Sequence, residues 1–101
     1  FFTEQIEGIF NLHPSVYRTA LVGVEGEPVL WVELEPHARQ IGRKKIISEL
    51  TALGQDHPQA AHIRTFLFLR RFPTDVRHNS KLLRERLARM AKDRLNRPSL
   101  A

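Results

Sequence analysis

The sequence of 101 residues lacks cysteine and an initiator methionine, and it has a single tryptophan and a single tyrosine. Without cysteine the chain has no disulfide framework and no thiolate nucleophile or metal ligand, which fits a reducing compartment such as the cytoplasm. No apolar run reaches the roughly 18 residues that a membrane-spanning helix requires. Residues 1–4 contain no basic region before an apolar run, so we expect the interior of a longer chain there rather than a signal peptide.

Acidic residues are scarce in the last third of the chain. Residues 70–97 contain ten Lys or Arg and three Asp or Glu, a charge of +7, whereas the whole chain carries +5, so the remainder sums to −2. A basic segment of this kind attracts anions, which include nucleic acid, phosphate ligands, a membrane surface and an acidic partner.

The first half of the sequence predicts a helix followed by a hairpin. Apolar residues at helical spacing indicate the helix, with Thr3 as its cap and Pro14 behind its end. Its inner face is Phe2, Ile6, Ile9, Phe10 and His13. Alternating residues predict strands over 17–24 and 28–35, joined by a turn at 25–27. The core-facing residues of the second strand are predicted to be Leu30, Val32 and Leu34, opposite Val29, Trp31 and Glu33.

The second half predicts two further helices around one strand. Apolar positions 46, 47, 50 and 53 mark a helix that ends at Gly54, and a polar irregular stretch follows over 55–62. An apolar run predicts a buried strand over 63–69, and a final helix is expected over 80–95. The inner stripe of that helix is predicted to be Leu83, Leu87, Met90, Ala91 and Arg94. The order α-β-β-α-β-α indicates one α+β domain over 1–101, with helices packed on a three-stranded sheet.

Lys81 stands where a polar loop becomes the final helix. A helix N-terminus disfavours a cation, so this position is unusual for a lysine that serves solubility alone. Its neighbours Arg77, His78, Asn79 and Ser80 can reach phosphate or ribose groups, although an ordinary turn accounts for them equally well. The residues around position 81 therefore form the candidate site.

Two interpretations of a different class stay open on the residues alone. The basic segment also fits a nucleic-acid-binding module, although its charges spread around the final helix and the sheet lacks the paired aromatic residues of an RNA-binding surface. A purely structural interaction domain is compatible with the same residues. A metal site is not expected, because His57 and His62 have no acid at ligand spacing nearby.

Several motifs, in order along nearly the whole chain, resemble a known family. Near the start, Ile6–Phe10 leads to His13-Pro14-Ser15-Val16 and then to Ala20-Leu21-Val22-Gly23-Val24. Near the end, Phe72-Pro73-Thr74 leads to Ser80-Lys81-Leu82-Leu83-Arg84-Glu85. These motifs resemble the C-terminal domain of the adenylate-forming superfamily, which includes acyl-CoA synthetases, firefly luciferase and the adenylation domains of peptide synthetases.

Two departures and one narrower likeness accompany this resemblance. Ser80 replaces the usual Gly of the family, and the spacing from Pro73 to Lys81 is two residues longer than in the common pattern. The run over 72–81, together with residues 2–5, is similar to the bacterial synthetases of long-chain olefin biosynthesis, a branch that makes a β-lactone from a 3-hydroxy fatty acid.

The resemblance implies that residues 1–101 are a C-terminal lid domain whose N-terminal ATP-binding domain is absent from this sequence. It implies Mg- and ATP-dependent activation of a long-chain carboxylic acid as acyl-AMP, then transfer to CoA or to the substrate's own hydroxyl. Lys81 matches the lysine that stabilises the adenylation transition state, and Arg77, His78, Asn79 and Ser80 are weaker candidates for substrate or nucleotide contacts. The isolated fragment is expected to be inactive. No membrane span is expected, and nucleic acid is not the expected partner.

Overall fold

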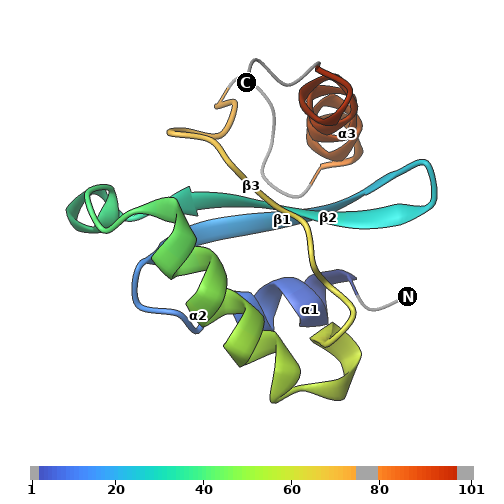
Figure 1. The fold of residues 1–101 in the computed structure, drawn as a ribbon. Helices are drawn as coiled ribbons and strands as arrows, with labels where there is room; N and C mark the ends of the chain where they lie inside the picture. Colours follow the sequence, from blue (N-terminus) through green and yellow to red (C-terminus); the bar gives the residue numbers. More distant parts are fainter. Residues whose placement is uncertain (1–2, 75–79, 98–101) are drawn as a thin grey trace.

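A computed structural model describes residues 3–74 and 80–97, and it has the predicted order α-β-β-α-β-α (Figure 1). The elements are α1 (Thr3–Phe10), β1 (Val16–Val24), β2 (Glu27–Leu34), α2 (Arg43–Gln55), β3 (Phe66–Phe68) and α3 (Lys81–Leu95), with single 3-10 turns at Pro36–Ala38 and Pro58–Ala60. The α+β class is therefore confirmed. Within the described ranges, no helix is long and apolar enough to cross a membrane.

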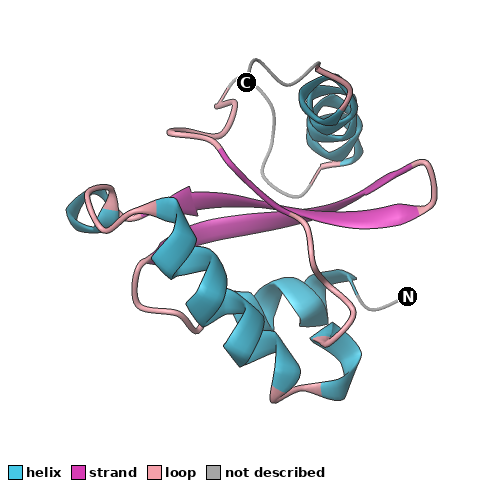
Figure 2. Ribbon diagram, viewed as in Figure 1, coloured by secondary structure: helices cyan, strands magenta, loops and turns pink. Residues whose placement is uncertain are grey.

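The three strands form one mixed sheet in the order β1-β2-β3 (Figure 2). β1 and β2 pair as the predicted antiparallel hairpin, with Leu21 opposite Leu30. β3 pairs with β2 in parallel, because the chain passes through α2 before it returns to the sheet. β1 is therefore an edge strand, and the groups on its outer side need partners from elsewhere in the domain.

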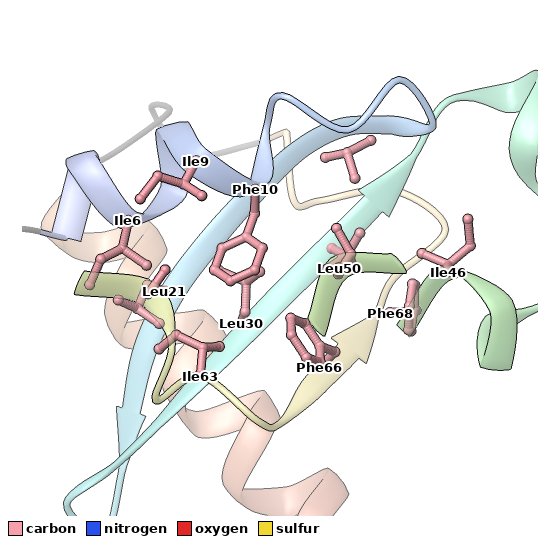
Figure 3. Close-up of a cluster of buried hydrophobic side chains, with 13 residues drawn as sticks. Ile6, Ile9, Phe10, Leu21, Leu30, Ile46, Leu50, Ile63, Phe66 and Phe68 are labelled. Carbon is pink, nitrogen blue, oxygen red and sulfur yellow. The ribbon is translucent and has the colours of Figure 1, made fainter. Parts of the chain in front are cut away.

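Helices cover both faces of the sheet (Figure 1). α1 and α2 lie on one face, over a core of 13 buried residues (Figure 3). Among the described helices, α3 is the one on the other face, over a second buried cluster that contains Val29 and Trp31. The expectation that the core lies on the Leu30 side of β2 was thus incomplete, since Trp31 is fully buried on the opposite side and Leu34 is only partly buried.

α1 begins at Thr3, the predicted cap, and ends at Phe10, before His13 of the predicted helical face. Two other predicted boundaries were wrong for a packing reason. Gly54 lies inside α2 rather than after its end. A Cβ there would come within 3.1 Å of both the Ala60 carbonyl oxygen and the Phe10 ring, so the position requires glycine for close approach. The strand predicted over 63–69 pairs regularly only over 66–68, because the preceding residues leave the turn at 58–60, where Ile63 N–H donates to the Ala60 carbonyl.

Candidate functional site

Lys81 is the first residue of α3, and the residue before it fixes where the helix begins. Ser80 adopts extended backbone angles, and its side-chain oxygen accepts a hydrogen bond of 3.0 Å from the Leu83 N–H. A serine in this position satisfies one of the backbone donors that every helix leaves open at its start. Ser80 therefore acts in the structure as the helix cap, while the candidates Arg77, His78 and Asn79 lie outside the described residues.

The Lys81 side chain is exposed and lies along a groove. On the α3 side the groove is lined by Lys81, Arg84, Glu85 and Ala88, and on the other side by residues of the β1–β2 hairpin and of α1. Among the residues that the structure describes, the Lys81 amine has no hydrogen-bond or ion-pair partner. An ammonium that stands at a fixed backbone position with no internal partner is available to an anion from outside the domain.

The inner side of α3 is held on the sheet by buried apolar contacts. Leu83, Leu87 and Ala91 are buried against the cluster that contains Trp31 and Phe72. The Trp31 indole Nε1–H donates to the Leu87 carbonyl oxygen at 2.9 Å, so the polar end of this buried ring is satisfied. These contacts confirm the predicted inner stripe of α3 and place the start of the helix over the sheet.

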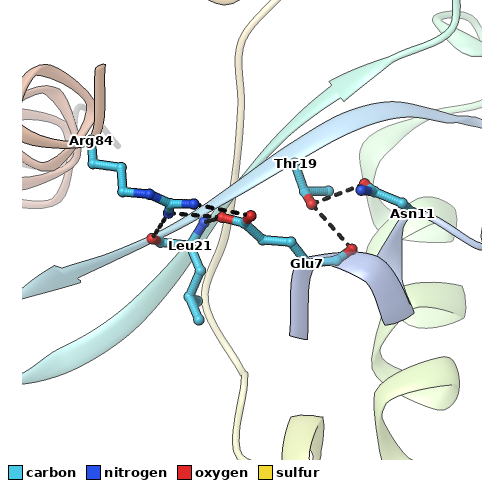
Figure 4. A network of polar contacts seen from close by, with 5 residues as sticks. All are labelled: Glu7, Asn11, Thr19, Leu21 and Arg84. Carbon is cyan, nitrogen blue, oxygen red and sulfur yellow. Dashed lines mark hydrogen bonds and ion pairs between the residues drawn. The ribbon is translucent and has the colours of Figure 1, made fainter. Parts of the chain in front are cut away.

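A buried carboxylate links three elements near the start of α3 (Figure 4). Glu7 of α1 is 5% exposed and accepts hydrogen bonds from Arg84 through both carboxylate oxygens, at 2.9 and 3.2 Å. Glu7 also accepts from the Leu21 N–H at 2.6 Å, and Arg84 donates to the Leu21 carbonyl oxygen at 3.0 Å. The Glu7–Arg84 pair therefore satisfies both outward-facing backbone groups of Leu21 on the edge strand.

A second buried carboxylate, Glu33 of β2, contacts the segment that follows β3. Glu33 is 6% exposed and accepts from Arg18 Nε at 2.8 Å and from the Phe72 N–H at 2.9 Å. The Arg18 guanidinium lies 5.1 Å from the centre of the Phe72 ring and 5.5 Å from that of Tyr17. This arrangement fixes the chain at Phe72, shortly before the undescribed residues 75–79.

Basic residues of the 70–97 segment are partly used inside the domain. Arg84 is paired with Glu7, and Arg94 lies 5.2 Å from the Trp31 ring centre and donates to the Phe68 carbonyl at 3.3 Å. Part of the positive charge that the sequence places on α3 is therefore structural.

The histidines do not form a metal centre within the described residues, where no group of three or more His, Cys, Asp or Glu is arranged to hold an ion. His13 instead contacts Glu49 of α2 at 2.6 Å and accepts from the Ser15 N–H at 3.0 Å. His13 lies just after the end of α1, and its contact with Glu49 connects α1 with α2.

Sequence reasoning missed both of the carboxylate–arginine pairs described above, Glu7–Arg84 and Glu33–Arg18. Glu7 follows Ile6 and precedes Ile9 and Phe10, so it borders the apolar face of its helix. Glu33 ends the apolar run 29–32 of β2. An acid in such a place signals a buried ion pair, because a buried carboxylate needs a cation or several donors. The partners, 77 and 15 residues away in sequence, carry no signal of their own.

Two curated relatives match most of this chain. The olefin beta-lactone synthetase of Xanthomonas campestris pv. campestris is 48% identical over 91 residues, which are 86% of this chain and 16% of that protein. The olefin beta-lactone synthetase of Stenotrophomonas maltophilia is 41% identical over the same shares. The chain thus spans about one sixth of the length of the curated relatives that it matches. No protein-family model matches it.

A solved structure has the same fold. The anthranilate CoA ligase AuaEII, crystallised in complex with anthranoyl-AMP, superposes with a TM-score of 0.71 at 22% identity over 90% of this chain and 18% of that one. These matches support the family expected from the sequence motifs, the C-terminal domain of the adenylate-forming superfamily.

Proposed function

We propose that this domain belongs to an ATP-dependent ligase that activates a carboxylic acid as its acyl adenylate, and that Lys81 stabilises the transition state of that step. The observation that carries the proposal is the position of Lys81: exposed, at the capped start of α3, with no partner among the described residues. The similarity to two olefin beta-lactone synthetases supports the reaction class.

The chemistry requires a cation at one place. A carboxylate oxygen attacks the α-phosphorus of ATP, the bond from that phosphorus to the bridging oxygen breaks, and pyrophosphate leaves with the electron pair. Negative charge builds on the phosphoryl oxygens while two anions approach each other. A fixed ammonium between the carboxylate and those oxygens lowers this barrier, and afterwards it holds the adenylate. Mg²⁺ accompanies ATP, and no described group of residues in this domain is arranged to bind it.

We infer the second half-reaction from the two relatives, which are olefin beta-lactone synthetases. A β-lactone ring forms when the hydroxyl on carbon 3 of an acyl adenylate loses its proton to a base and attacks the carbonyl carbon, while the bond from that carbon to the phosphate oxygen breaks and AMP leaves with the electron pair. We therefore propose a 3-hydroxy carboxylic acid as substrate, with its own hydroxyl as the acceptor; a long acyl chain stays a prediction of the sequence. Coenzyme A is the alternative acceptor. If CoA is added to the full-length protein and no acyl-CoA forms, coenzyme A is excluded as the acceptor.

The remaining part of the longer protein supplies the other groups of the site. Because the chain covers 16% of each curated relative, we propose that an N-terminal domain of the same polypeptide binds ATP and the acid. The exposed side of the groove, with Lys81 at its rim, then faces that domain during adenylation.

The test uses the full-length protein and separates the two steps. Lys81→Ala is expected to lower adenylation, measured by pyrophosphate exchange, about 10²–10³-fold, the loss typical of one fixed transition-state donor. Consumption of supplied acyl adenylate is expected to change much less. Lys92→Ala is the matched control, because Lys92 is an exposed lysine on the same helix, about 16 Å further along its axis. Equal losses in both steps would show that Lys81 is structural.

A further inference from the structure

We propose that Arg84, held by Glu7, is a positioning residue that sets where the Lys81 ammonium stands. This inference rests on the proposed role of Lys81 in adenylation. It assigns to the buried pair a function in the reaction in addition to its part in the fold.

The first step is the spacing of the two cations on α3. Arg84 follows Lys81 by three residues, so the two side chains leave the helix on the same side, one turn apart. Both line the same groove. Any displacement of Arg84 along or around the helix axis is therefore passed to Lys81 with little loss.

The second step is that apolar packing alone leaves this position loosely defined. Leu83, Leu87 and Ala91 hold α3 on the sheet by contacts that have no direction of their own, and the directional Trp31–Leu87 hydrogen bond lies six residues after Lys81. A bidentate arginine–carboxylate pair is directional, because two parallel N–H···O bonds fix both distance and orientation. The bonds from Arg84 to the two Glu7 oxygens add this restraint at the first turns of α3.

The third step is the path of the contact. α1 and α3 lie on opposite faces of the sheet, so Arg84 reaches Glu7 around the edge strand β1 (Figures 1 and 4). On the way it donates to the Leu21 carbonyl, while Glu7 accepts from the Leu21 N–H. The contacts of Arg84 thus fix the start of α3, and with it Lys81, relative to both α1 and the edge strand.

The fourth step concerns charge. Arg84 is a second cation within one turn of Lys81, and an unpaired arginine there would compete for the same anion. The Glu7 carboxylate, 6% exposed at its side chain, compensates that charge inside the domain. The pair therefore compensates the charge of Arg84, whereas the Lys81 ammonium has no such partner among the described residues.

The test compares Arg84→Met with Arg94→Gln in the full-length protein. Both changes remove an arginine that binds α3 to the rest of the domain, but Arg94 lies about 20 Å from Lys81 along the helix. Arg84→Met is expected to lower the adenylation kcat about 10–100-fold with KM for ATP little changed, since a displacement near 1 Å has effects of this size. Arg94→Gln is expected to leave kcat per folded protein near the wild-type value.

Two further variants separate positioning from general damage. In the Lys81→Ala/Arg84→Met double variant, adenylation is expected to equal that of Lys81→Ala alone, because Arg84 acts through Lys81. Arg84→Lys keeps the charge but not the two parallel bonds, so its kcat is expected to fall between wild type and Arg84→Met. If Arg84→Met does not fold, Glu7→Gln/Arg84→Met leaves no buried unpaired charge and takes its place.

The outcomes are distinct. Full adenylation by Lys81→Ala overturns the proposed function and this inference with it. A large loss in Lys81→Ala, together with equal rates for Arg84→Met and Arg94→Gln, overturns the positioning role alone. An additive loss in the double variant also overturns it, because Arg84 would then act independently of Lys81.

Discussion

Two carboxylate–arginine pairs among the described residues, Glu7–Arg84 and Glu33–Arg18, have the same construction and different tasks. Glu7–Arg84 and Glu33–Arg18 each join a nearly buried acid to a partly exposed arginine, and each acid also accepts a backbone N–H. Glu33–Arg18 joins adjacent strands and holds Phe72 beside them. Glu7–Arg84 joins helices on opposite faces of the sheet, and one of these helices begins with Lys81. The two pairs therefore share their chemistry and differ in the elements that they connect.

The largest expected effect on stability comes from breaking the pair that spans the layers. Arg84→Met leaves the Glu7 carboxylate buried without its arginine, and we expect the free energy of unfolding to fall by about 3–5 kcal/mol. Urea unfolding of the 101-residue chain measures it. The Glu7→Gln/Arg84→Met double variant is expected to recover much of the loss. A double variant no more stable than the single one would show that charge compensation is not the reason.

The second pair is expected to be less costly to break. Glu33→Gln keeps an oxygen that can accept from the Phe72 N–H but loses the charge opposite Arg18, whose side chain is 23% exposed and can turn to water. We expect a loss of about 1–3 kcal/mol in the same measurement, the range for a disturbed hydrogen bond to a charged group. A loss as large as that of Arg84→Met would remove the distinction drawn between the two pairs.

The smallest effects sharpen the comparison at the start of α3. Ser80→Ala removes the cap and is expected to cost about 1 kcal/mol, whereas Ser80→Gly is expected to cost a few tenths. The difference, followed by thermal unfolding, would explain why the usual glycine of the family and the serine of this chain both serve here. Equal costs for alanine and glycine would mean that the Ser80–Leu83 bond contributes nothing.

Hydrophobic periodicity was sufficient to predict the order of elements and the helix start at Lys81, because both follow from local pattern. Burial on both faces of β2 could not be predicted, since it depends on α3 crossing the second face. The requirement for glycine at position 54 comes from a contact with Phe10, 44 residues earlier, so the local sequence pattern could not predict it either. For the candidate site, the sequence indicated the lysine but not the arginine and the glutamate that hold its helix.

One measurement tests the central claim most directly: pyrophosphate exchange by the full-length Lys81→Ala protein beside Lys92→Ala, with supplied acyl adenylate followed in the same preparations. The account predicts that exchange falls about 10²–10³-fold in Lys81→Ala alone, while consumption of the adenylate is largely retained. Exchange at the wild-type rate in Lys81→Ala, or an equal fall in both variants, would contradict it.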